Sequence, residues 1–443
     1  MANSSSKGAN ISVDLKNRIM FLIGALFVFR VGSHIPVPGV DAVALNRLFE
    51  SANNGILGML NMFSGGSLSR FSVFAIGIMP YISASIVMQL ATEIIPSLKA
   101  LKKEGEAGRR VITKYTRIGT VLLAGVQSFA AAVMLFRQPG LVGISQYEFY
   151  LSTVVCLTTG TMFLMWLGEQ ITERGVGNGI SLIICAGIAA GIPGAIGKLF
   201  TMTAEGSLNP LLAVLIVAGA LALVYAVVYI ESAQRKVPIH FAKRQVGNRM
   251  MQGQNTVLPF KLNMAGVIPP IFASSIILFP TTIMSWVGGQ GIGTQSSSSF
   301  LGKLALYFQH GQPLYIIFFA SAVIFFCFFY TALVFSPREI AENLKKQGAF
   351  VPGIRPGENT SRYIESVVLR LTFYGALYIT IVCLIPELLV SFANIPFYLG
   401  GTSLLILVVV SIDFTAQVAS YRMSQQYQQY EGDKYLANKL GKK

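Results

Sequence analysis

The chain contains little charge for its size. Only 12% of its 443 residues are Asp, Glu, Lys or Arg, whereas 53% are hydrophobic, and the mean hydropathy is +0.60. A soluble domain carries about 25% charged residues. Because so few charges cannot cover the surface of a water-soluble globule of this length, the composition predicts that most of the surface faces lipid.

Cysteine and histidine are scarce as well. Each of the four cysteines lies in an apolar run without metal-ligand spacing, which is typical of small buried hydrophobic side chains and not of disulfides. The three histidines are far apart, and there is no catalytic triad, catalytic carboxylate pair or HExxH motif. The glycine-rich stretch at 175–179 lacks the Lys and Thr of a phosphate-binding loop. We therefore expect neither an enzyme nor a cofactor or metal site.

Long apolar runs are abundant. A membrane-spanning helix needs about 20 mostly apolar residues, and in lipid a helix satisfies all of its backbone groups internally. The alternating short segments of a membrane barrel are absent. The sequence thus predicts an all-α polytopic membrane protein with ten spans, at Ile19–Pro38, Phe74–Ile95, Tyr115–Phe136, Phe149–Ile171, Asn178–Phe200, Leu211–Ile230, Asn263–Val287, Pro313–Phe335, Val367–Leu389 and Pro396–Ser420.

The basic residues predict the orientation of these spans. An even number of spans places both termini on one side, and Lys and Arg accumulate on the cytoplasmic side. Of the 34 basic residues, all but six lie in the termini and loops of a single side. Both termini are therefore expected in the cytoplasm, and the six exceptions are Arg30, Arg47, Arg70, Arg137, Lys198 and Lys303.

The ten spans divide into two sets of five. Because five is odd, the two halves would have opposite orientations, as inverted repeats do, although we find no residue-level identity between them. The expected organisation is an arm at 1–17, a first half at 18–200, a connection at 201–210, a second half at 211–420 and a tail at 421–443. Two long basic loops, at 231–262 and 336–366, are either docking surfaces or plain solvated loops beside lipid headgroups.

A polar, glycine-rich segment, Asn61–Arg70, directly precedes the second span. Such a segment at membrane depth has to lie in a protein-lined cavity, and the alternative is an ordinary external loop. Ile78 and Ile82 are one helical turn apart, as are Ile180 and Ile184, so each pair shares a helix face. By themselves these are ordinary membrane isoleucines.

Ionisable residues are few within the spans, where they usually mark ion or proton pathways. The clearest of them, Glu93, Glu169, Arg174 and Asp413, fall near predicted cytoplasmic ends. This scarcity counts against an ion-coupled transporter of a small solute. That class and a non-transporting membrane scaffold remain the alternatives to a channel.

Several ordered motifs resemble the SecY family of bacterial protein-export channels. They include NMFSGGSLSR (61–70), GIMPYISAS (77–85), KKEGEAGRR (102–110), GTMFLMWLGEQITERGVGNG (160–179), NMAGVIPPIFASSIILFP (263–280), KKQGAFVPGIRPG (345–357) and FYLGGTS (397–403). The resemblance implies ten helices in two inverted five-helix halves around a central pore with a plug at about 58–73. It also implies a hinge around Ala204–Asn209.

The resemblance assigns roles to particular residues. A pore ring is implied at Ile78, Ile82, Ile180, Ile184, Ile271 and Ile406. The plug would include Asn61, Phe63, Ser64, Gly65, Gly66, Ser67, Leu68, Ser69 and Arg70. A lateral gate between the second and third spans and the seventh and eighth would include Gln89, Gln127, Asn263, Ser274 and Ser275. Docking contacts are implied at Arg244, Arg249 and Arg355, and Asn248 stands where many relatives are basic.

The function implied by the resemblance is that of a passive protein-conducting channel. It would export unfolded preproteins across the bacterial plasma membrane and release transmembrane segments sideways into lipid. The SecA ATPase or the translating ribosome would drive transport. The implied partners are SecE, SecG, SecA, the ribosome and preprotein signal sequences, with SecDF, YidC and anionic lipids as further candidates.

Overall fold

The computed structural model describes residues 5–41, 44–45, 61, 64–138, 140–206, 209–241, 244–246, 249–251, 255–287, 312–393 and 400–440. Each of the ten predicted spans overlaps a helix of this structure. These helices are α1 (Ser5–Gly32), α4 (Met79–Ile94), α6 (Glu106–Phe136), α7 (Gln146–Arg174), α8 (Gly179–Ala204), α9 (Pro210–Glu231), α10 (Ile268–Val287), α12 (Pro313–Val334), α14 (Glu358–Ala393) and α15 (Gly401–Leu440).

Seven helices of the described part are long and apolar enough to cross a membrane. The number rises to eight if α4 and the short helix α5 (Pro96–Lys103), bent by 96° from it, count as one broken span. The bend falls at Ile95, whose extended backbone is the conformation that a following proline favours. α5 therefore turns away from the direction of α4.

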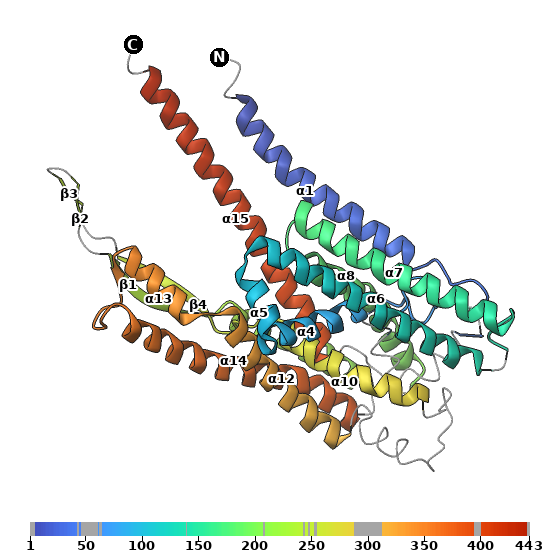
Figure 1. Ribbon diagram of the computed structural model, residues 1–443. Helices are drawn as coiled ribbons and strands as arrows, with labels where there is room; N and C mark the ends of the chain where they lie inside the picture. The colour runs from blue at the N-terminus through green and yellow to red at the C-terminus, as the bar shows by residue number, and fades with distance from the viewer. Residues whose placement is uncertain are drawn as a thin grey trace.

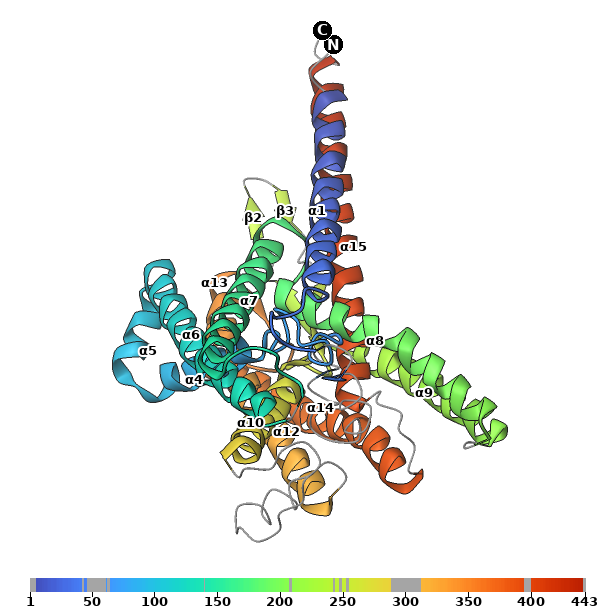
Figure 2. The ribbon, with the colours of Figure 1, turned by 90° about the vertical axis from the view of Figure 1, so that its right-hand side faces the viewer.

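The helices form a bundle from which α1 and α15 project together, so that both termini lie at one end (Figure 1). We call this end the terminal face. The strands β2 (Arg244–Val246) and β3 (Arg249–Met251) also lie on the side of the termini in Figure 2.

Three predicted spans begin several residues later than the hydrophobic pattern indicated, among them the tenth, which was expected from Pro396 and whose helix α15 begins at Gly401. The second was expected from Phe74, but its helix begins at Met79, because Gly77 has a left-handed φ of +65° and Pro80 occupies the first helical turn. The seventh was expected from Asn263, but α10 begins at Ile268, and Asn263 lies in a turn that its own side chain stabilises. Hydrophobicity continues into both turns, which hides these boundaries from the sequence.

The two long loops are joined in one antiparallel sheet, which the sequence analysis did not predict. In the first loop, β1 (Gln234–Phe241) pairs with β4 (Asn255–Lys261), with Val237 opposite Leu258. In the second, β5 (Ala349–Phe350) pairs with the other edge of β1, which gives the order β4-β1-β5. The short helix α13 (Pro337–Lys346) precedes β5.

This sheet has a small core of its own. Val237, Ile239 and Phe260 are buried against Leu344 of α13 and Ile364 of α14. Val237 and Ile239 alternate with exposed neighbours along β1, as expected for a strand with one buried face. The two loops therefore form a single packed unit at the terminal face.

Candidate functional site

The six isoleucines singled out by the sequence lie in one hydrophobic cluster at the centre of the bundle. Five of them, Ile78, Ile82, Ile184, Ile271 and Ile406, are at most 6% exposed, and Ile180 is half-buried against the same cluster. Ile78 directly precedes α4 and Ile82 lies on it, while the others belong to α8, α10 and α15. The cluster therefore combines side chains from both five-helix halves.

Helix geometry explains why these positions converge. Ile180 and Ile184 are four residues apart on α8, so both side chains project from the same face, and Ile78 and Ile82 have the same spacing. Branched apolar side chains offer no group that can replace the hydration shell of an ion. A narrow ring of such side chains excludes water and ions.

A cavity of about 250 Å³ lies between the isoleucine cluster and the terminal face. Its lining includes Ser181, next to Ile180, and Val410, one turn beyond Ile406 toward the C-terminus. Apolar residues form much of its wall, and the polar and charged side chains that also line it are Asn178, Ser181, Glu231, Lys261, Asn263, Asp413 and Gln417. The cavity, which has polar groups in its wall, thus lies beside the cluster.

The glycine-rich segment lies on the opposite side of the cluster. A side-chain carbon added to Gly65 would lie 2.9 Å from the Cα of Gly187, which is three residues beyond Ile184 on α8. The backbone of Ser64 lies close to Gly77, the residue before Ile78. The segment therefore packs directly against the elements that carry the isoleucines.

Residues 64–70 form consecutive turns, which their own polar side chains stabilise. The carbonyl and side-chain oxygens of Asn61 accept hydrogen bonds from the backbone amides of Gly66 and Ser69, each at 2.8 Å. Gly65 and Gly66 have φ values of +67° and +81°, which glycine adopts most easily. Arg30 of α1 donates a 3.0 Å hydrogen bond to the carbonyl oxygen of Gly65.

The segment is largely enclosed by protein. Ser64 and Ser67 are buried, and Leu68 packs against a separate hydrophobic cluster between α6, α7 and the turns before α4. Ser69 and Arg70 are half-buried, and Phe63 lies outside the described residues. The polar stretch is thus surrounded by protein. This agrees with the interpretation as a protein-lined segment and not with an ordinary external loop.

Among the expected gate residues, Ser275 has a described contact between α10 and α4, and the described hydrogen bonds of Gln89 and Ser274 stay within their own helices. The hydroxyl of Ser275 donates to Sδ of Met79 at 3.9 Å and to the carbonyl of Ile271, and Ser274 bonds to the same carbonyl. Gln89 of α4 bonds to Ser85 and Gln127 of α6 is half-buried. Ser275 therefore provides a direct contact across the α4–α10 boundary.

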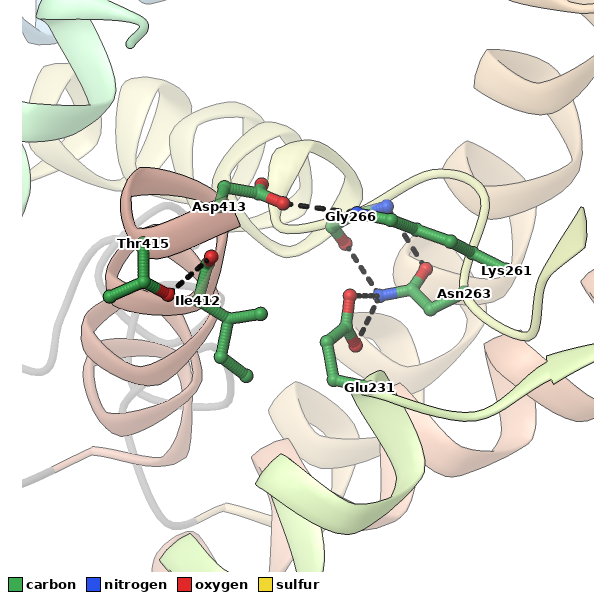
Figure 3. A network of polar contacts seen from close by, with 7 residues as sticks. All are labelled: Glu231, Lys261, Asn263, Gly266, Ile412, Asp413 and Thr415. Carbon is green, nitrogen blue, oxygen red and sulfur yellow. Dashed lines mark hydrogen bonds and ion pairs between the residues drawn. The ribbon is translucent and has the colours of Figure 1, made fainter. Parts of the chain in front are cut away.

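Asn263 differs from these residues, because its side chain is directed toward α9 (Figure 3). Its amide nitrogen donates to both carboxyl oxygens of Glu231, at 3.4 and 3.2 Å, and to the carbonyl of Gly266. Close by, Lys261 forms a 3.0 Å ion pair with Asp413 of α15. A gate role for Asn263 stays a prediction without support from these contacts.

The expected docking residues lie in the two joined loops. Arg355 is exposed in the turn after β5, and its carbonyl accepts a hydrogen bond from Thr360. Arg244 and Arg249 are the first residues of β2 and β3, which form a two-stranded ribbon with Val246 opposite Arg249. Their side chains lie outside the described residues.

Three of the acidic residues near the span ends form ion pairs. Glu93 pairs with Lys99 and Lys102 at the bend between α4 and α5, and Glu169 of α7 pairs with Arg117 of α6 at 2.6 Å. Asp413 pairs with Lys261. In the described part of the chain, these carboxylates therefore act as links between elements.

Comparison with known proteins identifies the family. The SecY family profile matches residues 72–415. Protein translocase subunit SecY of Escherichia coli K12 is 57% identical over 418 residues, which cover 94% of this chain and 93% of that protein. The chain belongs to the SecY family. SecY of Vibrio cholerae is also 57% identical, over 416 residues covering 94% of this chain and 93% of that protein.

Solved structures share the fold of this SecY-family chain. One, described as a protein conducting channel, aligns with a TM-score of 0.67 at 18% identity and covers 93% of both chains. A second, described as Sec61 in a canine ribosome–channel complex from the endoplasmic reticulum, aligns with a TM-score of 0.63 over 93% of both chains at 18% identity. The ten-helix arrangement is thus that of SecY and Sec61 channels, and the chain is a multi-pass membrane protein.

The sequence analysis missed Glu231 and Lys261 as partners of Asn263 and Asp413. Glu231 ends a long apolar run, so nothing in the local pattern distinguishes it from a surface carboxylate at a helix end. The missed sheet did leave a signal, because β1 alternates inward and outward side chains.

Proposed function

We propose that this chain is the central pore-forming subunit of the Sec translocon, a passive channel for unfolded polypeptides. The supporting observation is the cluster of six isoleucines from both halves, with the cavity on one side and the glycine-rich segment on the other. A ring of oily, deformable side chains seals against ions at rest and yields to a passing chain of any sequence.

The six isoleucines are proposed as the pore ring, and residues 61–70 as the plug. The plug closes the side of the ring away from the terminal face, where Gly65 packs against Gly187 and Arg30 holds its carbonyl. Displacement of the plug breaks these contacts without unfolding a helix, because residues 64–70 are turns. Transport then requires motion of the plug and a small widening of the ring.

Lateral release into lipid is proposed at the α4–α10 boundary. Its described polar contacts, such as Ser275 to Met79, are weak, so separating the helices costs little. A hydrophobic signal segment binds better to the open gate than to the closed one, and it shifts the population accordingly. The connection around Ala204–Asn209 between the halves is the proposed hinge.

Partners are proposed at the terminal face, which we place in the cytoplasm of the bacterial cell because basic residues concentrate there. The joined loops, with Arg355 exposed and Arg244 and Arg249 on the ribbon, are the proposed docking surface for SecA and the ribosome. SecE and SecG are the proposed membrane subunits, and signal sequences the proposed ligands. SecDF, YidC and anionic lipids are further candidates.

Reconstitution tests this proposal. The purified chain, combined with SecE and SecG in lipid vesicles, is expected to translocate a preprotein when SecA and ATP are added, and not when either is omitted. Circular dichroism confirms that the reconstituted chain is helical. Absence of preprotein uptake by the folded complex, or saturable uptake of a small solute in its place, would overturn the proposal.

A further inference from the structure

The loop between β4 and α10 is held on both sides by polar contacts. We call residues 261–266 the linker. At its start, Lys261 forms the ion pair with Asp413 of α15. Two residues later, Asn263 bonds to the buried carboxyl group of Glu231 at the end of α9 (Figure 3). Three helical elements, α9, α10 and α15, therefore meet at this short segment.

The contact between Glu231 and Asn263 also closes the base of the β1–β4 hairpin. Glu231 precedes β1 by three residues and Asn263 follows β4 by two. Between them, the amide of Leu262 donates to the carbonyl of Ala233 at 3.1 Å. These hydrogen bonds join the segment before β1 to the segment after β4. The sheet consequently cannot tilt freely on these two connections.

The linker leads directly into the isoleucine cluster. α10 begins at Ile268, and Ile271 lies three residues further on. Asp413 lies seven residues, or two helical turns, beyond Ile406 on α15. Asn263 and Asp413 thus lie within a few turns, along the chain, of two of the six clustered isoleucines, Ile271 and Ile406.

We propose that Glu231 and Asn263 are positioning residues that couple the β4-β1-β5 sheet to α10. With their hydrogen bonds intact, the sheet and the start of α10 move together, and α10 is held against α4. A partner that displaces the sheet then displaces α10 and Ile271. The role of a docking partner rests on the proposed function, whereas the coupling of the sheet to α10 does not.

The energetic basis is the burial of the Glu231 carboxyl group, which is 4% exposed. A buried acceptor that loses its donor incurs the full cost of desolvation. Asn263→Asp replaces the donor by a second carboxyl group, which repels the first and cannot bond to the carbonyl of Gly266 unless protonated. The double variant Glu231→Gln with Asn263→Asp restores a donor–acceptor pair with the roles exchanged.

The test measures the α4–α10 contact directly. Met79→Cys and Ser275→Cys are introduced into the full chain with the four native cysteines replaced by alanine, because the native side chains at 79 and 275 are in contact. Asn263→Asp is expected to lower the rate of disulfide formation between positions 79 and 275 by about tenfold, the effect of leaving one buried acceptor without its donor. The exchanged pair is expected to restore the rate to within about twofold.

Asn178→Asp is the matched control. Asn178 lines the same cavity and caps α8 through a bond from the Ile180 amide, which Asp accepts equally well. It adds the same charge without touching Glu231, and its cross-linking rate is expected to equal that of the parent. If Asn263→Asp does not accumulate, Glu231→Gln alone is measured, with a smaller decrease expected.

The proposed coupling would be overturned by any of three results for the rate of disulfide formation. These are an unchanged rate in Asn263→Asp, an equal decrease in Asn178→Asp, or no recovery in the double variant Glu231→Gln/Asn263→Asp. These outcomes are independent of transport. A chain that fails to translocate in vesicles but shows this pattern contradicts the proposed function and leaves the coupling intact.

Discussion

At the scale of single residues, the isoleucine cluster depends on side chains that are bulky, branched and apolar. Replacing Ile82 and Ile184 together with glycine removes two of its members from different helices, α4 and α8. The gap admits water, and water carries ions. We expect a several-fold rise in the resting ion conductance of planar bilayers that contain the reconstituted channel.

Ile196→Gly provides the control for this substitution. Ile196 lies on the same helix as Ile184 but is 46% exposed on the surface of the bundle. Glycine at either position costs a helix about 1 kcal/mol relative to alanine, so a general loosening of α8 would affect both. A conductance in Ile82→Gly/Ile184→Gly no higher than in Ile196→Gly would mean that the cluster does not form the seal.

Substitutions at two adjacent glycines of the proposed plug distinguish the effect of backbone conformation from the effect of packing. Gly65→Ala and Gly66→Ala each place a side chain at a left-handed φ, at a cost of about 1–2 kcal/mol. Only at Gly65 would the new carbon also meet the backbone of Gly187, at 2.9 Å, since nothing lies within 4 Å at Gly66. The additional overpacking costs about 1–3 kcal/mol in the closed state.

Gly65→Ala is therefore expected to raise the resting conductance well above that of Gly66→Ala, because the closed plug loses its fit against α8. Protease resistance of the folded chain serves to show that neither variant has lost its global fold. Equal conductance in the two variants would show that the contact with Gly187 does not hold the plug.

At the scale of elements, the joined sheet makes one surface from two loops that are about 100 residues apart in the chain. Helix α13 and the start of α14 pack beneath it, so a force on any strand reaches the membrane helices. The exposed Arg355 lies at the edge of this unit. A partner that binds here engages both loops at once.

Arg355→Glu is expected to reduce SecA-dependent translocation into vesicles by about tenfold, since reversing one charge at a binding surface both removes an attraction and adds a repulsion. Arg110→Glu is the matched control. Arg110 is exposed on the first turns of α6, outside both joined loops, and its reversal changes the net charge equally. Equal transport by the Arg355→Glu variant and the unmodified chain would remove the docking role.

The hydrophobic pattern predicted a helix at every span, but it did not predict where several of them begin. Apolar residues continue through the turns before Met79 and Ile268, so only the backbone conformation at Gly77 and Gly266 marks the boundaries. Similarly, the spacing of Ile78 and Ile82 predicted a shared face and not a shared cluster with Ile406. Contacts between residues far apart in the chain require the packed structure or a family resemblance.

At the scale of the whole molecule, two halves of opposite orientation meet at the isoleucine cluster. One half contributes Ile78, Ile82, Ile180 and Ile184, and the other contributes Ile271 and Ile406. An interface between two bodies that move about one connection opens without unfolding either of them. The proposed polypeptide pathway at this interface accounts for the cavity, the isoleucine cluster and the proposed plug, which follow one another across the bundle.

The most direct test of this pathway is disulfide cross-linking of a preprotein halted during translocation. A single cysteine in the mature part of the halted chain is offered to single cysteines at Ile82, Ile406 or Ile196 of the channel, in the background without native cysteines. The account predicts cross-links at Ile82 and Ile406 and none at Ile196. Absence of cross-links to both clustered positions, or equal cross-linking at Ile196, would contradict it.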